Sequence, residues 1–101
     1  MIDLERKAKV FKALAHPTRL QIVLLLAAAE EKCVCEIIPL VGASQPMVSR
    51  HLAVLREAGI VASRKKGLEV HYRLTLPCVA KLLDCLDHAC TRDSCCAREE
   101  L

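Results

Sequence analysis

Aromatic residues are almost missing from this chain of 101 residues, which contains one Phe, one Tyr and no Trp. A core must therefore be built from Leu, Val, Ile and Ala, a composition that favours helices packed on helices. Long apolar runs are missing too, because the longest, residues 22–29, is far shorter than the roughly 20 residues of a membrane-spanning helix. The first ten residues mix charges of both signs and lack the apolar segment of a signal peptide. We therefore expect a cytoplasmic protein with no membrane partner.

A chain of this length is near the lower end of what buries a useful core alone. We expect a single domain over residues 1–101, which would gain further burial by forming a homodimer. The net charge of +3 is mild, but residues 41–75 contain six Lys or Arg and only two Asp or Glu. A localised basic region in a small protein indicates an anionic partner, and nucleic acid is the first candidate.

Apolar spacing and breaker residues predict a mainly α protein with a small β-hairpin. The predicted elements are helices over residues 3–15, 17–29, 33–40 and 44–59, strands over 60–65 and 68–74, and a last helix that starts at Pro77. Pro17 suits the first turn of the second helix, and Ser44 suits the N-cap of the fourth. Residues 30–32 are expected to be a polar turn, and Lys66-Gly67 the hairpin turn. Beyond the last helix we expect a flexible, cysteine-containing tail over residues 91–101.

Four helices, a two-stranded hairpin and a last helix form the plan of a winged helix-turn-helix protein. In that plan the helix after the turn enters the DNA major groove, and its N-terminal residues meet the base edges. The candidate contact residues on this helix are Ser44, Gln45, Pro46, Ser49, Arg50 and His51. Glutamine can pair with adenine, and arginine can bind guanine or phosphate. Arg64, Lys65 and Lys66 near the hairpin tip are expected to form a mobile cationic wing for phosphate or the minor groove. The alternative is that all these residues are ordinary solvated surface.

Seven cysteines are unusual in such a chain, and clustered thiols in a reducing compartment indicate metal or redox chemistry. Cys33 and Cys35 lie at the start of the third predicted helix, where the peptide dipole lowers a thiol pKa. Residues i and i+2 of a helix point about 200° apart, so these two thiols should share a small ion only if the helix end distorts. Cys90, Cys95 and Cys96 are near or in the predicted tail, where packing does not explain them, so we expect them to serve as ligands.

Four segments, in order and within residues 10–74, resemble the ArsR/SmtB family of metal-sensing repressors. They are F-K-A-L-A-H-P-T-R-L-Q-I-V-L-L-L from Phe11, C-V-C-E from Cys33, S-Q-P-M-V-S-R-H-L-A-V-L-R-E-A-G-I-V from Ser44, and R-K-K-G-L-E-V-H-Y-R-L from Arg64. The resemblance implies a winged-helix homodimer joined through the first and last helices. Such a dimer binds double-stranded operator DNA and leaves it when its metal binds. No organic cofactor is expected. An enzyme with a Cys–His dyad, such as Cys35 with a distant histidine, is the least favoured alternative, because the sequence has no Gly-rich phosphate loop and no pocket-forming second domain to support it.

Within that family, C-V-C on the helix before the recognition helix is typical of thiolate sensors of arsenite, antimonite, cadmium or lead. The best-known arsenic pattern has a third cysteine three residues later, a position occupied here by Ile38. We expect Cys95 or Cys96 to complete the site with Cys33 and Cys35, and a separate site made of tail thiols is the competing geometry. As(III) or Sb(III) is the leading inducer because trivalent arsenic takes three thiolates. The alternatives are a cadmium- or lead-responsive repressor using the same thiols, and a redox-switched regulator that forms a disulfide.

Histidines are not expected to be ligands in this chain. The family's zinc-type site on the last helix uses Asp and His, but Asp84, Asp87 and His88 offer only part of such a set, so we expect them on the solvated surface. His16 and His71 are expected at helix-cap and hairpin positions.

Overall fold

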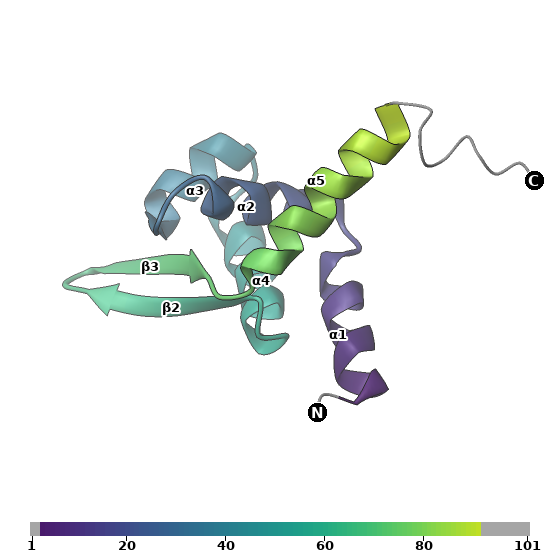
Figure 1. The fold of residues 1–101 in the computed structure, drawn as a ribbon. Helices are drawn as coiled ribbons and strands as arrows, with labels where there is room; N and C mark the ends of the chain where they lie inside the picture. Colours follow the sequence, from purple (N-terminus) through teal and green to yellow (C-terminus); the bar gives the residue numbers. More distant parts are fainter. Residues whose placement is uncertain (1–2, 92–101) are drawn as a thin grey trace, which may run out of the picture.

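The computed structural model describes residues 3–91, with side chains to residue 88, and it has the predicted helices in the predicted order (Figure 1). The elements are α1 (Leu4–Leu14), α2 (Pro17–Ala27), β1 (Lys32–Cys33), α3 (Val34–Val41), α4 (Gln45–Glu57), β2 (Val61–Lys66), β3 (Glu69–Leu74) and α5 (Pro77–Thr91). The prediction of a winged helix-turn-helix architecture is confirmed. One strand, β1, is additional, since Lys32 belongs to it and not to a turn.

Residues at the starts of α2 and α4 explain why these helices begin where they do. Pro17 is the first residue of α2, and His16 is the cap, with its Nδ1 accepting a hydrogen bond from the Thr18 N–H at 3.1 Å. Ser44 caps α4, and its hydroxyl accepts from the Met47 N–H at 3.4 Å. Both helix starts agree with the sequence prediction.

The core lies between α2, α3, α4 and the base of the hairpin. Its large, fully buried side chains are Ile22, Val23, Leu26, Ile37, Val48, Leu52, Leu55 and Ile60. On α2 and α4 they recur at intervals of three and four, the spacing of one helix face. Tyr72 of β3 joins the same cluster. The core thus holds one face of α4 in place and leaves the opposite face exposed.

The three strands form an antiparallel sheet in the order β1-β3-β2. β1 pairs with the edge of β3 that the hairpin leaves open, and this register places Cys33 opposite His71. On the other edge of β3, Lys66 pairs with Glu69, so the hairpin turn is Gly67-Leu68 and the predicted turn is wrong by one residue. Gly67 has a φ of 63°, in the left-handed region, and therefore opens the turn.

Apolar side chains remain uncovered on α1 and α5. Leu4 and Phe11 of α1 are 78% and 62% exposed, and Leu82 and Leu86 of α5 are 39% and 52% exposed. Figure 1 shows both helices on the side of the molecule away from the hairpin tip. Between residues 3 and 91, no single helix is long and apolar enough to cross a membrane, and α1 and α2 reach that length and composition only together, across a 95° bend.

Candidate DNA-contacting surface and metal centre

The exposed start of α4 is the first candidate surface. α3 ends at Val41 and is capped by Gly42, whose φ of 76° is in the left-handed region. α4 begins three residues after Gly42, so the two helices are joined by a short turn. The exposed predicted contact residues at this end are Ser44, Gln45, Pro46, Ser49 and Arg50. This helix end therefore offers an amide, a hydroxyl and a guanidinium to solvent, the groups that hydrogen-bond to base edges and phosphates.

His51 does not belong to this surface, because it is only 6% exposed. Its Nδ1 accepts a hydrogen bond from Arg19 Nε at 3.2 Å, and its ring lies 4.5 Å from the His16 ring, centroid to centroid. Burial lowers the pKa of His51, and neighbouring positive charges lower it further. His51 shares the buried face of α4 with Val48 and Leu55, at helical spacings of three and four. It therefore connects α4 to α2 and is not placed to meet DNA.

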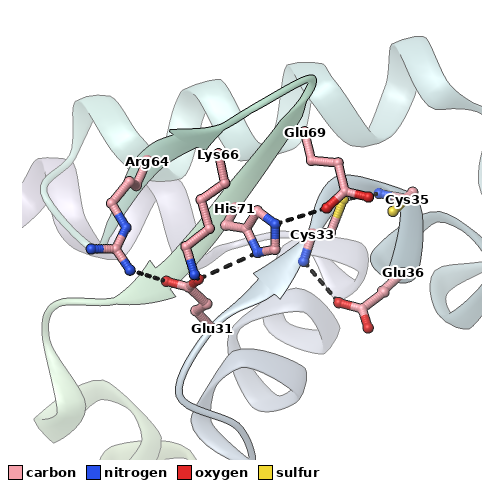
Figure 2. Close-up of polar contacts among 8 residues, drawn as sticks. All are labelled: Glu31, Cys33, Cys35, Glu36, Arg64, Lys66, Glu69 and His71. Atoms are coloured by element: carbon pink, nitrogen blue, oxygen red, sulfur yellow. Dashed lines mark hydrogen bonds and ion pairs between the residues drawn. The ribbon is translucent and has the colours of Figure 1, made fainter.

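The cations of β2 are exposed but partly engaged within the molecule. Glu31, in the segment before β1, receives Arg64 Nη2 at 3.4 Å and also forms an ion pair with Lys66 Nζ (Figure 2). The hydrogen bond from Lys66 lowers the pKa of Glu31, and the positive charges of Lys66, Arg64 and His71 act in the same direction. Lys65, between the two paired cations, points to the other face of the strand. The sequence did not reveal Glu31 because its partners are more than thirty residues away.

Cys33 precedes α3 instead of belonging to it. Its backbone is extended, with φ −72° and ψ 148°, and it is the N-cap residue of the helix. Its Sγ accepts a hydrogen bond from the Cys35 N–H at 3.3 Å, while Glu36 Oε1 accepts from the Cys33 N–H at 2.9 Å. Residues i and i+2 diverge by about 200° only when both are helical, and here only Cys35 is. The chain therefore departs from helical geometry at Cys33, which is the condition under which the two thiols were expected to share an ion.

The proximity of Cys33 also changes the acidity of Cys35. The hydrogen bond to Cys33 raises the pKa of Cys35 to about 11, and partial burial and the negative charges of Cys33, Glu69 and Glu36 contribute to the rise. The sequence predicted the opposite direction, from the dipole at the start of α3. The hydrogen bond to Cys33, which stabilises the protonated thiol, opposes that dipole most strongly, and the neighbouring anionic groups act in the same direction. A cation bound at the thiols would reverse the effect, since it would stabilise both thiolates.

Two further side chains with possible metal-ligand atoms lie beside Cys33. The Cys33 Sγ, a ring nitrogen of His71 and a carboxylate oxygen of Glu69 all lie within 4.8 Å of one another. His71 Nε2 is 3.0 Å from Glu69 Oε1, and Nδ1 is 3.4 Å from Glu31 Oε2 (Figure 2). Alternation along β3 places Glu69 and His71 on one face, but only the pairing of β1 with β3 brings them to Cys33. The prediction that His71 is at a hairpin position is confirmed, and its neighbours were not foreseen.

An open cavity of about 390 Å³ connects the thiols with the recognition helix. Cys33, Cys35 and Ile38 line one part of it, and Gln45 and Ser49 of α4 line another. Cys35 and Ile38 are three residues apart on α3 and therefore share a helix face. The position at which the arsenic pattern has its third cysteine thus faces the same cavity as the first two.

The other predicted ligands cannot be placed beside this cavity. Cys95 and Cys96 lie outside the described residues, as does the side chain of Cys90, and α5 includes Thr91, the first residue of the predicted tail. On α5, Asp84 and His88 are exposed, and His88 Nδ1 lies 3.0 Å from the Asp84 carbonyl oxygen. Their predicted location on the solvated surface is confirmed.

Comparison with known proteins agrees with this arrangement. The family described as "Bacterial regulatory protein, arsR family" matches residues 16–63. The arsenical resistance operon repressor of Escherichia coli is 51% identical over 79 residues, which are 75% of this chain and 68% of that protein. The arsenic resistance transcriptional regulator ArsR1 of Pseudomonas putida is 55% identical over 65 residues, which are 64% of this chain and 51% of that protein. The chain thus spans about two thirds of one relative and about half of the other.

A solved structure covers more of the chain. The homodimeric winged helix-turn-helix DNA-binding domain Mb0332 of Mycobacterium bovis, a possible ArsR-family regulator, superposes with a TM-score of 0.78 and 31% identity, over 97% of this chain and 90% of that one. Fold and site therefore define a winged helix-turn-helix transcriptional regulator, and not an enzyme. The chain belongs to the ArsR family of bacterial regulatory proteins.

Proposed function

We propose that this protein is a cytoplasmic repressor that leaves its operator when As(III) or Sb(III) binds its cysteine thiolates. The observation that carries the proposal is the cavity that Cys33 and Cys35 share with Gln45 and Ser49. An ion held by the two thiols would lie beside the base-reading end of α4. Binding of the metalloid and binding of DNA would then compete for the position of the same helix. The names of the relatives from E. coli and P. putida support arsenic as the signal.

A third thiolate has to come from outside the immediate wall of the cavity, because Ile38 occupies the remaining position on α3. We propose that Cys95 or Cys96 supplies it, with Cys90 as a further candidate. The sulfur could belong to the same subunit or to its partner. A site formed by these three cysteines alone is the competing geometry, and substitutions at Cys33 and Cys35 distinguish the two.

The proposed repressor binds double-stranded DNA as a homodimer joined through α1 and α5. The exposed apolar side chains of these helices support this pairing, because their burial would gain about 25 cal/mol for each Å² removed from water. The proposed DNA contacts are Ser44, Gln45, Pro46, Ser49 and Arg50 of α4 with Arg64, Lys65 and Lys66 of β2. His51 is omitted because it is buried.

Release from DNA tests the proposal directly. A duplex selected from a random pool would be bound by the full chain under reducing conditions and followed by fluorescence anisotropy during titration with arsenite, antimonite, cadmium, lead, zinc and peroxide. We expect arsenite and antimonite to release the wild type and a control variant, Cys78→Ser, whose cysteine is exposed on α5. Cys33→Ser and Cys35→Ser should remain bound.

Each other outcome has a defined meaning. Release by cadmium or lead alone would assign these ions as the inducer, and release by peroxide alone would assign a redox switch. Full arsenite response in Cys33→Ser and Cys35→Ser would place the site among Cys90, Cys95 and Cys96. A chain that binds no DNA in any condition would refute the repressor function.

A further inference from the structure

His71 lies between two carboxylates, with Glu69 Oε1 3.0 Å from its Nε2 and Glu31 Oε2 3.4 Å from its Nδ1. A neutral imidazole carries one N–H, so it can donate to only one of them, and its other nitrogen then presents a lone pair to an anion. Nδ1 is buried and makes no hydrogen bond of good geometry in the described structure. A cation on Nε2 would remove the conflict, because Nδ1 could then keep the proton and donate it to Glu31.

The atoms around Nε2 are those that a divalent metal ion needs. Cys33 contributes a sulfur and Glu69 a carboxylate oxygen, each within 4.8 Å of the other and of the imidazole nitrogen. Cys35 lines the same cavity as Cys33 and Glu69, and its backbone N–H donates to the Cys33 Sγ at 3.3 Å, so a small movement of its side chain would add a second sulfur. Two sulfurs, one imidazole and one carboxylate are all groups that bind zinc, and four of them complete its tetrahedral coordination.

The distances are compatible with closure around such an ion. Zinc binds nitrogen, oxygen and sulfur at roughly 2.0–2.3 Å, which in a tetrahedron separates the ligand atoms by about 3.3–3.8 Å. Atoms that already lie within 4.8 Å of one another need to approach by at most about 1.5 Å. Glu69 is exposed and its flexible side chain can supply most of this movement. Cys33 and His71 already face each other across paired strands.

We propose that Cys33, Cys35, Glu69 and His71 form a zinc site that ties the start of α3 to the wing. Glu31 is a positioning residue in this site, since a carboxylate that accepts the Nδ1 proton orients a metal-bound histidine. The site shares Cys33 and Cys35 with the proposed metalloid site, so the two ions compete. It does not depend on the metalloid response, because imidazole and carboxylate have no part in a three-thiolate arsenic site.

Zinc affinity, measured by competition with a chromophoric chelator, tests the site in the full chain with Cys90, Cys95 and Cys96 changed to serine. We expect one zinc ion per chain, and a weakening of tenfold or more in His71→Gln and in Glu69→Gln. Glu31→Gln should weaken binding by about tenfold while leaving the ligand atoms unchanged. His88→Gln is the matched control, since His88 is exposed on α5 beside Asp84, and it should bind zinc like the parent.

X-ray absorption at the zinc edge gives a readout that does not depend on any variant folding. We expect two sulfur and two nitrogen or oxygen neighbours around zinc in the parent chain. Four sulfur neighbours, no bound zinc, unchanged affinity in His71→Gln, or lost affinity in His88→Gln would each overturn the proposal.

Arsenite binding, followed by arsenic–thiolate absorbance in the chain with all seven cysteines, separates the two sites. His71→Gln should retain it. A chain that binds arsenite but no zinc would refute only the zinc site. A chain that binds zinc but not arsenite would refute only the metalloid function.

Discussion

Replacing Ile38 with cysteine would supply the third thiolate that this chain lacks on α3. Ile38 shares a helix face with Cys35, and both line the cavity with Cys33. Ile38→Cys therefore adds a third sulfur to one continuous cavity wall. If arsenic binds in this cavity, the substitution should make any sulfur from outside the cavity wall unnecessary.

The best background for the test is the chain with Cys90, Cys95 and Cys96 changed to serine, which we expect to remain on DNA when arsenite is added. Adding Ile38→Cys should restore release from DNA. The half-maximal arsenite concentration should be lower than in this background by an order of magnitude or more, since even the loss of an outer partner of a ligand changes metal affinity about tenfold. Ile38→Ser is the matched control, because serine has nearly the same size and shape as cysteine but no soft ligand atom.

The substitution also has a stability cost that can be worked out. Ile38 is partly buried against the core, and cysteine is smaller by about two carbon-sized groups. At about 0.8 kcal/mol for each fully buried methylene, half burial gives a loss of about 1 kcal/mol. The melting temperature should then fall by roughly 4–8 °C, as expected for a domain of this size. A folded Ile38→Cys chain, identified by this modest shift, that still ignored arsenite would show that the metalloid does not bind in the cavity.

Three further predictions concern α4 and the thiols. Arg50→Ala should weaken operator binding by about 1–3 kcal/mol in an anisotropy titration, whereas Lys81→Ala on α5 should leave it unchanged; equal effects would refute base or phosphate contact by Arg50. His51→Ala should lower the free energy of unfolding in urea by about 2 kcal/mol through lost packing and a lost hydrogen bond, without changing the DNA affinity of the folded protein. Because the folded-state pKa of His51 is lowered, the unfolded chain takes up the proton first, so stability should fall as pH drops below 6.5, and this slope should be smaller in His51→Ala. Cys35 should react slowly with iodoacetamide at neutral pH. Cys33→Ala should speed its alkylation, read by mass spectrometry, by about tenfold, because alanine removes the hydrogen-bond partner that is the main cause of the raised pKa of Cys35; an unchanged rate would contradict that cause.

Helices were predictable in this chain because each signal was local. Pro17 and Ser44 act within one turn, and the apolar spacing of α2 and α4 lies within a single helix. The misplacement of His51 shows how a polar residue type can mislead, because its spacing from Val48 and Leu55 places it on the buried face. Position on the helix was the better guide there than chemical character.

The candidate metal centre depended on contacts that no local pattern encodes. β1 has two residues, too few to show alternation, and forms because β3 has a free edge. Its pairing converts Cys33 from a helical residue into a cap and places it opposite His71. The two thiols were recognisable from C-V-C, but their mutual orientation and the identity of their neighbours followed only from this short strand.

Glu31 gives the wing a built-in counter-anion. Its carboxylate holds Arg64 and Lys66 in the way a DNA phosphate would, so each phosphate contact made by these cations must displace an existing ion pair. Binding to DNA of arbitrary sequence rests on such phosphate contacts. The ion pairs with Glu31 should therefore lower the affinity for DNA of arbitrary sequence. The proposed base contacts of α4 would carry no such penalty. Because Arg64 and Lys66 are proposed contacts in the operator complex too, this single internal acid would weaken phosphate binding to operator and to non-specific DNA alike, and the proposed base contacts of α4 would have to distinguish the two.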